Sequence, residues 1–275
     1  MLRGFYGAAA GMITQQRRTE MLTENMANIN TPGYKGDHAS IRSFPEMMIS
    51  AQNTASMPPN QAAPIGTLAT GVYMQERTPN FTQGDLRETG NSTDIALLQG
   101  NMPVNEETGR AGALFFNVTN ENGEQRYTRN GSWTVDGDGA LVTAEGHYIL
   151  GTDGNTINVG NEHFIVGENG VIETEEGMIA GQIGVAFAGN PESLVREGGG
   201  LYRLGEGEGE LPDALEVEEV NFQLNQGFLE GANIDAAQTM AEMNSAFRTF
   251  EANQKVLQAY DQSMDKAVNE VGRLG

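Results

Sequence analysis

The stretch Asn28-Ile29-Asn30-Thr31-Pro32-Gly33-Tyr34-Lys35 marks the point at which this chain changes its architecture. A proline disfavours the helical conformation at the residue before it, and Pro32-Gly33 suits the two central positions of a type II turn. A helix that precedes this stretch is therefore expected to end near Asn30. A counterpart, Gly227-Phe228-Leu229-Glu230-Gly231-Ala232-Asn233-Ile234-Asp235, stands before a second helical segment. The sequence thus predicts helices at both ends and a different structure between them.

The N-terminal segment carries apolar residues at intervals of three and four, which is typical of a helix that buries one face. Gly4, Gly7 and Gly11 each cost about 1 kcal/mol of helix stability relative to alanine, so this helix is expected to be marginal alone. The same glycines offer a smooth surface for the close approach of a second helix. The apolar positions in this register are Leu2, Phe5, Ala9, Met12, Leu22, Met26 and Ile29.

The C-terminal segment predicts a longer and stronger helix. Asn233 is a good N-cap residue, and Asp235 would then lie in the first turn, where the helix dipole favours an acidic side chain. With roughly 40 residues at about 1.5 Å each, the helix could reach roughly 60 Å, more than a core of this size needs. A mostly apolar series with strict three–four spacing resembles a coiled-coil pattern. Its members are Met240, Met243, Phe247, Phe250, Gln254, Leu257, Asp261, Met264, Val268 and Val271.

Two packing modes of the end helices remain open at this point. They could form a hairpin within one molecule, or they could pack between molecules in an assembly, and both could occur together.

The middle of the chain predicts strands. From about residue 72 to residue 224, short β-branched and aromatic runs such as Ala113–Thr119 and His163–Val166 alternate with glycine-containing turns. The predicted fold class is α+β: a mainly β central domain flanked by N- and C-terminal helices that pair as a coiled-coil-like rod. The expected boundaries are 1–35 for the N-terminal helix and its motif, 36–71 for a linker or extended arm, 72–226 for the β-rich domain and 227–275 for the long C-terminal helix.

Composition excludes several classes of function. The formal charge is −21, and almost all of it lies on residues 36–226, so nucleic acid and anionic membranes would be repelled. There is no cysteine, which excludes disulfides, thiolate nucleophiles and cysteine zinc sites. No stretch approaches the roughly 20 apolar residues of a membrane span, so direct membrane insertion is not expected. No Sec-type signal is visible, and export would have to use another route.

Motifs that could carry chemistry are weak. Asp136-Gly137-Asp138-Gly139 lacks the later ligands of a calcium loop and predicts a hairpin turn instead. The glycines of residues 205–209 alternate with glutamates that would repel a phosphate. The three histidines have no ligand-like spacing. We therefore predict no catalytic residue, no cofactor, no metal and no small-molecule substrate.

Three blocks in the chain resemble the flagellar basal-body rod and hook proteins of bacteria. The first is residues 25–35, Asn25-Met26-Ala27 followed by the opening stretch. The second includes Gln83-Gly84-Asp85-Leu86, Tyr127-Thr128-Arg129-Asn130-Gly131 and Asp138-Gly139-Ala140-Leu141. The third joins Leu229-Glu230-Gly231-Ala232-Asn233-Ile234-Asp235 to Phe250-Glu251-Ala252-Asn253. The chain departs from the family pattern at Glu24, at Ala232 and in an apparent insertion at 101–112. Its length is similar to that of a rod subunit, of the distal-rod-like, Gram-positive type.

The resemblance implies a non-enzymatic structural subunit of the flagellar basal-body rod. Such a subunit leaves the cytoplasm unfolded through the flagellar type III export apparatus, assembles in a helical tube through its terminal helices, and transmits torque towards the hook. The implied partners are copies of itself and other rod and hook proteins. The residues expected to serve assembly are Leu2, Phe5, Met12, Leu22, Asn25, Met26, Asn28, Ile29, Asn30, Pro32, Gly33, Tyr34, Leu229, Asn233, Ile234, Met240, Met243, Phe247, Phe250, Asn253, Leu257, Met264 and Val268.

Alternative functions remain open on sequence grounds. Within the same class, the chain could be a hook–rod junction or minor rod component. From other classes, the acidic clusters raise a secreted cell-wall glycan hydrolase and a calcium-binding adhesion module.

Overall fold

The computed structural model describes residues 2–51, 63–106, 109–120, 122–205, 207 and 209–271. The chain folds as two compact units, and each unit gathers segments that are far apart in the sequence. The helix unit contains residues 1–26, 37–78 and 235–275, and the β unit contains residues 27–36 and 79–234. The secondary structure is α+β with a mostly β centre and a helix near each end, as predicted.

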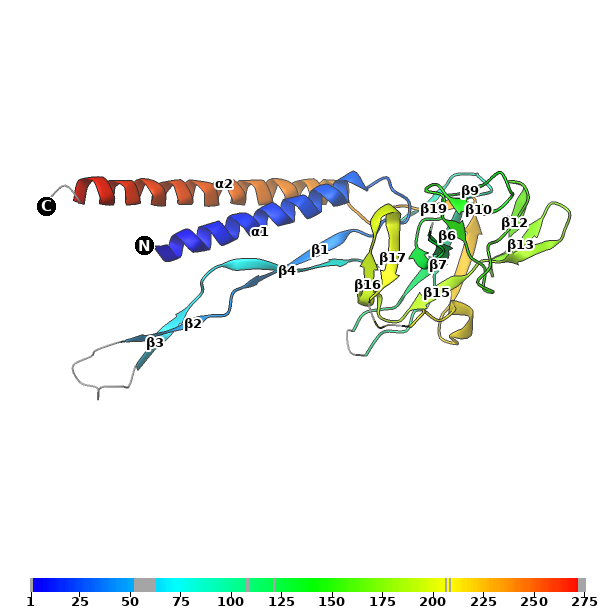
Figure 1. Ribbon diagram of the computed structural model, residues 1–275, viewed down its shortest axis with the longest axis horizontal. Helices are drawn as coiled ribbons and strands as arrows, with labels where there is room; N and C mark the ends of the chain where they lie inside the picture. The colour runs from blue at the N-terminus through cyan, green and yellow to red at the C-terminus, as the bar shows by residue number, and fades with distance from the viewer. Residues whose placement is uncertain are drawn as a thin grey trace. The chain divides into compact units, whose positions relative to one another are not determined.

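Two antiparallel helices dominate the helix unit. They are α1, Leu2–Ala27, and α2, Ala236–Lys266, which continues as a π-helical turn over Ala267–Val271. Figure 1 shows the start of α1 and the end of α2 at the same end of this pair. Within the described residues, no helix combines the length and the apolar character that crossing a membrane requires.

The helix boundaries correct two expectations. α1 ends at Ala27 rather than near Asn30, because a turn in which Thr31 N–H donates to Asn28 O (3.0 Å) follows it. The N-cap of α2 is Asp235 rather than Asn233: the Asp235 carboxylate accepts hydrogen bonds from the N–H groups of Ala237 and Gln238. α2 itself spans 31 residues and continues through the π-helical turn to Val271, where the described residues end.

The expected turn after α1 is present. Gly33 has φ 67°, and Tyr34 N–H donates to Thr31 O over 3.3 Å, which places Pro32 and Gly33 at the centre of the turn. A positive φ at the third turn position is what a type II turn needs, and glycine adopts it without strain.

Two strand pairs complete the helix unit. β1, Asp37–Ser43, pairs with β4, Val72–Pro79, and β2, Met47–Ala51, pairs antiparallel with β3, Ala63–Leu68. The expected linker or arm over 36–71 thus contains strands, and its segment 52–62 lies outside the described residues. The pair β1–β4 lies against α1, since Thr14 Oγ1 donates to Val72 O over 3.1 Å.

The β unit is built from short antiparallel strands. An eight-stranded sheet has the order β16-β17-β8-β7-β11-β10-β9, with β15 also paired to β7. Smaller pairings are β12-β13-β14, β18-β6 and β19-β5. The bounds are β5 Leu86–Glu88, β6 Ile95–Gln99, β7 Ala113–Thr119, β8 Gln125–Thr128, β9 Trp133–Val135, β10 Leu141–Thr143, β11 Tyr148–Ile149, β12 Phe164–Val166, β13 Val171–Thr174, β14 Ile179–Gln182, β15 Val185–Ala188, β16 Leu194–Arg196, β17 Leu201–Leu204, β18 Phe222–Gln226 and β19 Phe228–Glu230, with 3₁₀ turns at Pro191–Ser193, Gly198–Gly200 and Ala214–Glu216.

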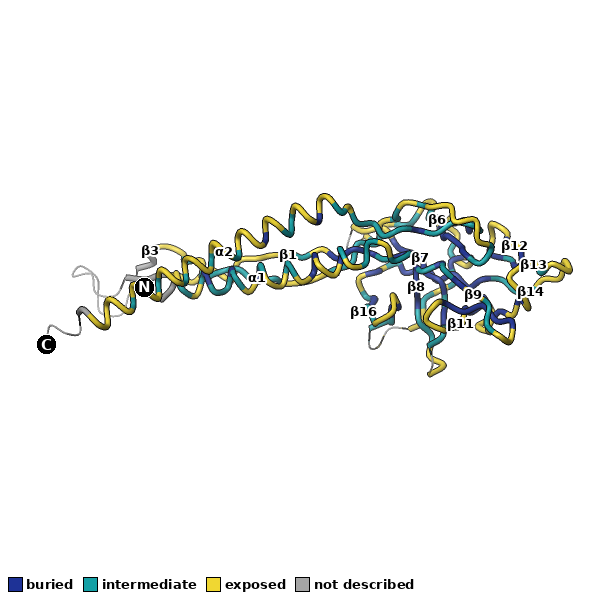
Figure 2. Tube along the Cα trace, turned by 90° about the horizontal axis from the view of Figure 1, so that it is seen from above, coloured by how far each residue is buried: buried dark blue, intermediate teal, exposed yellow. Residues whose placement is uncertain are grey.

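The core of the β unit lies on both faces of β7. Leu114, Phe116 and Val118 enter a large cluster that includes Trp133, whose ring centroid is 4.8 Å from that of Phe116. Alternate residues on the other face, with Phe115 at the centre, enter a second cluster. Figure 2 shows the buried positions gathered in the β unit, whereas α1 and α2 carry mostly intermediate and exposed ones. Among its described residues, the helix unit therefore has no comparable core of its own.

Candidate assembly interface

The two helices approach each other where α1 carries glycine. A Cβ added to Gly4 would lie 1.9 Å from Tyr260 Oη, and one added to Gly11 would lie 2.8 Å from Asn253 Nδ2. Further along, Arg18 Nη2 pairs with Glu242 Oε2 at 3.0 Å. The partners on α2 run backwards as those on α1 run forwards, so the contact is antiparallel. The smooth glycine surface predicted from the sequence thus faces the second helix at Gly4 and Gly11.

The less exposed side of α2 forms a row with three–four spacing. Of the predicted series, Met243, Phe250, Leu257 and Met264 lie in this row. Its other members are Thr239, Ala246, Asn253 and Tyr260, of which only Asn253 was expected. Apolar spacing alone did not select Asn253 or Tyr260, whose side chains lie against α1 where Gly11 and Gly4 carry no Cβ atom.

Several apolar residues of the two helices are exposed to solvent. On α2, Met240 is 52% and Phe247 47% exposed, and on α1, Tyr6 is 63% and Ile13 51% exposed. Val268 is also exposed. Exposed apolar residues at helical spacing indicate a surface that another molecule can cover.

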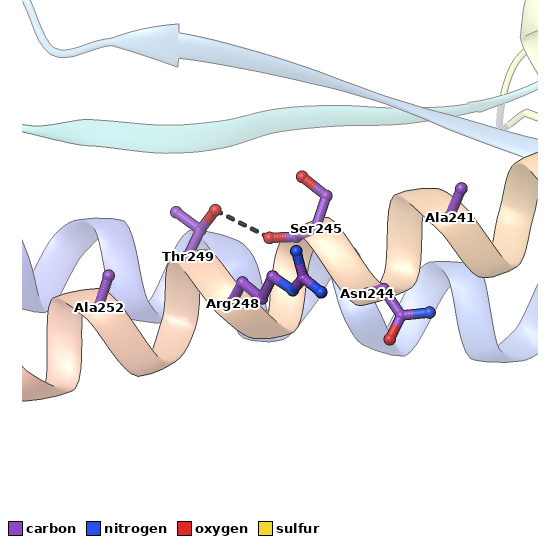
Figure 3. A pocket seen from close by; sticks show the side chains of 6 residues that line it. All are labelled: Ala241, Asn244, Ser245, Arg248, Thr249 and Ala252. Carbon is purple, nitrogen blue, oxygen red and sulfur yellow. Dashed lines mark hydrogen bonds between the residues drawn. The ribbon is translucent and has the colours of Figure 1, made fainter.

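A shallow groove runs along the outer side of α2. Figure 3 shows its six lining residues on successive turns: Ala241, Asn244, Ser245, Arg248, Thr249 and Ala252. Arg248 is the one charged group among these lining residues. Thr249 Oγ1 donates to Ser245 O over 2.8 Å. Such an open groove on a single helix suits contact with another protein surface better than enclosure of a small molecule.

Asn25 fixes the start of β1. Its Nδ2 donates to Asp37 O over 2.9 Å, and its Oδ1 accepts from Asp37 N–H over 3.0 Å. Arg77 bonds the carboxylates of both Asp37 and Glu24. Asn25, expected to serve assembly, therefore has a buried role inside the helix unit.

A buried ionic cluster in the β unit, which we name the clasp, consists of Lys35, Arg129 and Glu230. Glu230 Oε1 accepts from Lys35 Nζ over 2.7 Å, and Glu230 Oε2 accepts from Arg129 Nε over 2.5 Å. The three side chains are only 2%, 1% and 2% exposed, in the order Lys35, Arg129 and Glu230. One carboxylate therefore holds two cations away from water.

Carbonyl groups and one amide complete the clasp. Arg129 Nη1 and Nη2 donate to Leu114 O (2.7 Å) and Leu97 O (2.8 Å). Lys35 Nζ also donates to Thr82 O over 2.8 Å, and Gly84 N–H donates to Glu230 Oε1 over 2.8 Å. Because a buried charge is tolerated only when it is paired and hydrogen-bonded, this network explains how the fold accommodates all three groups.

The electrostatics of the clasp follow from burial and mutual charge. Burial lowers the pKa of Lys35 to about 8, the positive charge of Arg129 acts in the same direction, and Glu230 opposes both. Burial alone would raise the pKa of Glu230, but the charges of Arg129 and Lys35 outweigh burial and hold that pKa below its usual value. At neutral pH the clasp therefore contains two cations and one anion.

The two motifs interlock around the clasp. Gly33 N–H donates to Glu230 O over 2.8 Å, and a Cβ at Gly33 would lie 2.4 Å from Arg129 O. Asn233 Oδ1 accepts from Gly36 N–H over 2.8 Å, and Asn233 Nδ2 donates to Asn80 O over 2.7 Å. This engagement is the reason that Asn233 does not cap α2.

Tyr34, the last motif residue before the clasp lysine, packs under a further cation. The Arg196 guanidinium lies 4.7 Å from the centre of the Tyr34 ring, and its Nη1 is 3.2 Å from the Tyr34 hydroxyl oxygen. Gly33, Tyr34 and Asn233 were expected to serve assembly, and the structure gives each of them contacts inside the β unit.

The sequence prediction missed the clasp, although a signal was present. Each of the three family-like blocks contributes one charged member: Lys35 from the first, Arg129 from the second and Glu230 from the third. The other expected residues are distributed as follows: Leu22 is buried; Phe5, Met12, Met26, Asn28, Ile29, Pro32, Leu229 and Ile234 are partly buried; Asn30 is exposed; and the side chain of Leu2 lies outside the described residues.

The described residues contain no group of three or more histidine, aspartate or glutamate side chains arranged to hold a metal ion. Residues 136–139 form the tight turn expected from the sequence: Asp136 Oδ1 accepts from the N–H groups of Asp138 (3.0 Å) and Ala140 (2.8 Å).

Comparison with known families gives three matches in chain order. Residues 5–35 match the family described as flagella basal body rod protein. Residues 111–174 match the D1 domain of the flagellar hook protein FlgE/F/G, and residues 225–270 match the C-terminal region of the flagellar basal body rod FlgEFG proteins.

Curated proteins match over the full length. The flagellar hook-basal body complex protein FlhO of Bacillus subtilis is 46% identical over 274 residues, covering 100% of both chains. The flagellar basal-body rod protein FlgG of Borreliella burgdorferi is 28% identical over 284 residues, covering 98% of each chain. FlgG of Bacillus subtilis is 27% identical over 282 residues, covering 98% of this chain and 99% of its own.

Proposed function

The chain belongs to the flagellar hook and basal-body rod protein family, and we propose that it is a structural subunit of the bacterial flagellar basal body. It builds part of the rod, works without catalysis, and acts by binding its neighbours. The observation that carries this function is the full-length relationship to FlhO, together with family matches at both helical ends of the chain.

Assembly proceeds through the terminal helices. The pair α1–α2 lacks a core of its own and exposes apolar side chains, whereas the β unit has a closed core. Copies of the chain pack their helices together in a head-to-tail series that does not close, which generates a helical tube. The paired helices form a coiled-coil-like rod in that tube, and the acidic β unit keeps the outer surface solvated.

Export precedes assembly. The subunit leaves the cytoplasm unfolded through the flagellar type III apparatus and takes its place outside the cell membrane without a Sec signal. Its immediate partners are copies of itself and other rod and hook components. A marginal α1 with three glycines would become fully ordered on incorporation, which limits premature polymerisation.

The sequence identities to FlhO and FlgG favour one role within the family. Identity to FlhO of Bacillus subtilis is 46%, against 27% to FlgG of the same organism. A role of the kind named for FlhO, in the hook-basal body complex, is therefore the first choice, and that of a distal-rod subunit of the FlgG kind is the second. No finding favours a glycan hydrolase.

Deletion of the gene, followed by electron microscopy of purified basal bodies, tests this function. A truncated rod without hook or filament is expected, and the point of truncation gives the position of the subunit. Intact, motile flagella in the deletion strain would contradict a structural role.

A further inference from the structure

α1 carries a pair of apolar residues, Tyr6 and Ile13, that the described part of the chain leaves exposed. Tyr6 and Ile13 each follow by two residues a glycine that meets α2, which places them about 200° round the helix from that contact. They are 63% and 51% exposed. Ala10 and Gly7, against which Gly71 packs, lie about 40° and about 100° round the helix from Tyr6, so the pair stands at the open edge of that contact.

α2 carries a matching pair. Met240 and Phe247 are seven residues apart, as are Tyr6 and Ile13, and they flank the less exposed row of α2. Seven residues make about two helical turns, so each pair lies on one side of its helix. Two pairs with the same spacing on antiparallel helices can meet one to one, Tyr6 with Phe247 and Ile13 with Met240.

These pairs cannot meet within one molecule. Tyr6 lies between Gly4 and Gly11, and so it stands level with the part of α2 between Asn253 and Tyr260. Phe247 is about ten residues away from that level, or roughly 15 Å along the helix axis. Only a second helix pair, displaced along the axis, can bring the two apolar pairs together.

We propose that Tyr6 and Ile13 of one copy dock on Phe247 and Met240 of a second copy displaced by roughly 15 Å along the helix axis. This contact rests on the proposed function and specifies it. It is heterologous, since α1 of one copy meets α2 of the next, and it repeats along the axis without closing. It also keeps all copies pointing the same way, because the pairing between copies is antiparallel like the pairing within each copy.

Cysteine crosslinking tests the contact in assembled basal bodies. The chain has no cysteine, so introduced thiols report only the chosen positions. Two single-cysteine versions with different tags, Tyr6→Cys and Phe247→Cys, are co-expressed, basal bodies are purified, and mild oxidation follows. A disulfide requires Cα atoms within about 4.4–6.8 Å, which makes the readout specific for register. Because each copy carries one thiol, every bond between the two tags joins two copies.

The expected result is a mixed dimer from Tyr6→Cys with Phe247→Cys and from Ile13→Cys with Met240→Cys. The matched control combines Tyr6→Cys with Val268→Cys, because Val268 lies about as far from the level of Tyr6 in the opposite direction. All these positions are exposed, and protease resistance of the β unit verifies that each variant folds.

Other outcomes overturn the contact. If the variants enter basal bodies and only the Val268 pair crosslinks, or none does, the contact is wrong while the structural function stands. If Tyr6→Cys crosslinks to a different protein, another component occupies this face. If the chain is absent from basal bodies of motile cells, the proposed function fails and the contact fails with it.

Discussion

The clasp and the helix pair treat side chains in opposite ways: the clasp buries charged groups, and the helix pair leaves apolar groups exposed. In the clasp, three charged groups are at most 2% exposed, and each is held by at least two hydrogen bonds within the β unit. In the helix pair, apolar side chains such as Phe247 remain about half exposed. The difference shows that folding alone buries the residues of the clasp, whereas the helix pair keeps apolar surface that another molecule can cover.

Glu230→Ala, which removes the anion of the clasp, should cause the largest loss in the free energy of unfolding. The change leaves Lys35 and Arg129 buried side by side without their anion, and breaking a buried pair in this way costs about 3–5 kcal/mol. The free energy of unfolding of the purified protein, from denaturant titration, should fall by that amount. Glu218→Ala is the control, because Glu218 is exposed and its loss should cost under about 0.5 kcal/mol. Equal losses in both variants would show that the clasp contributes nothing special.

Gly33→Ala should produce the next largest loss. Alanine is strained at φ 67°, and its Cβ would collide with Arg129 O at 2.4 Å. Gly90→Ala is matched, since Gly90 has φ 72° and no atom within 4 Å of an added Cβ. The control isolates backbone strain of about 1 kcal/mol, and the collision should add about 1–3 kcal/mol at Gly33. Thermal unfolding of the two variants measures the difference, and equal melting temperatures would refute the steric argument.

The turn at Gly33 also shows what the sequence could predict. Pro32-Gly33 specifies a local conformation, and the β-branched and aromatic run over Ala113–Thr119 specifies a strand, so both were predicted correctly. Local chemistry also suggested Asn233 as a helix cap, but its amide is engaged by Gly36 and Asn80. That competition depends on segments more than 150 residues apart in the chain, and no local pattern reveals it.

Local sequence patterns could not predict the clasp or the register of the two helices, and the reason is the same for both. A lone Lys35, Arg129 or Glu230 resembles any surface charge until the fold brings the three together. On α2, the strict three–four spacing ran through Gln254 and Asp261, whereas Tyr260 and Asn253, the latter expected for assembly, make the contacts. The deciding information lies on α1, where Gly11 and Gly4 leave room for polar side chains.

The pH dependence of stability should reveal the clasp with a smaller effect. The pKa of Lys35 is about 8 in the folded chain, below its ordinary value of about 10.4 when unfolded. Between these values the unfolded chain binds more protons, so stability rises with pH, by at most about 1.4 kcal/mol per pH unit. Below pH 8 the contribution is constant, because Lys35 is protonated in both states.

Lys35→Met provides the reference for that measurement, since methionine does not titrate and fills a similar volume. The difference in free energy of unfolding between the wild-type chain and this variant should shift in favour of the wild type from pH 8 to pH 10. A difference that stays flat across this range would mean that Lys35 has an ordinary pKa and is not held as the clasp geometry implies.

Phe247→Asp should have the smallest effect on the chain and a large effect on its assembly. The side chain is 47% exposed and packs in neither core cluster, so an aspartate there should change the free energy of unfolding by under about 0.5 kcal/mol. In basal bodies the same aspartate would place a charge in an apolar contact between copies, and incorporation should be lost. Phe116→Asp is the contrasting variant, because Phe116 is fully buried and the β unit itself should unfold. Purified basal bodies probed with an antibody against the chain measure incorporation, and motility provides an independent readout. A stable, fully incorporated Phe247→Asp subunit would remove the distinction between the two regions, because the exposed face of α2 would then be solvent-facing in the assembly as well.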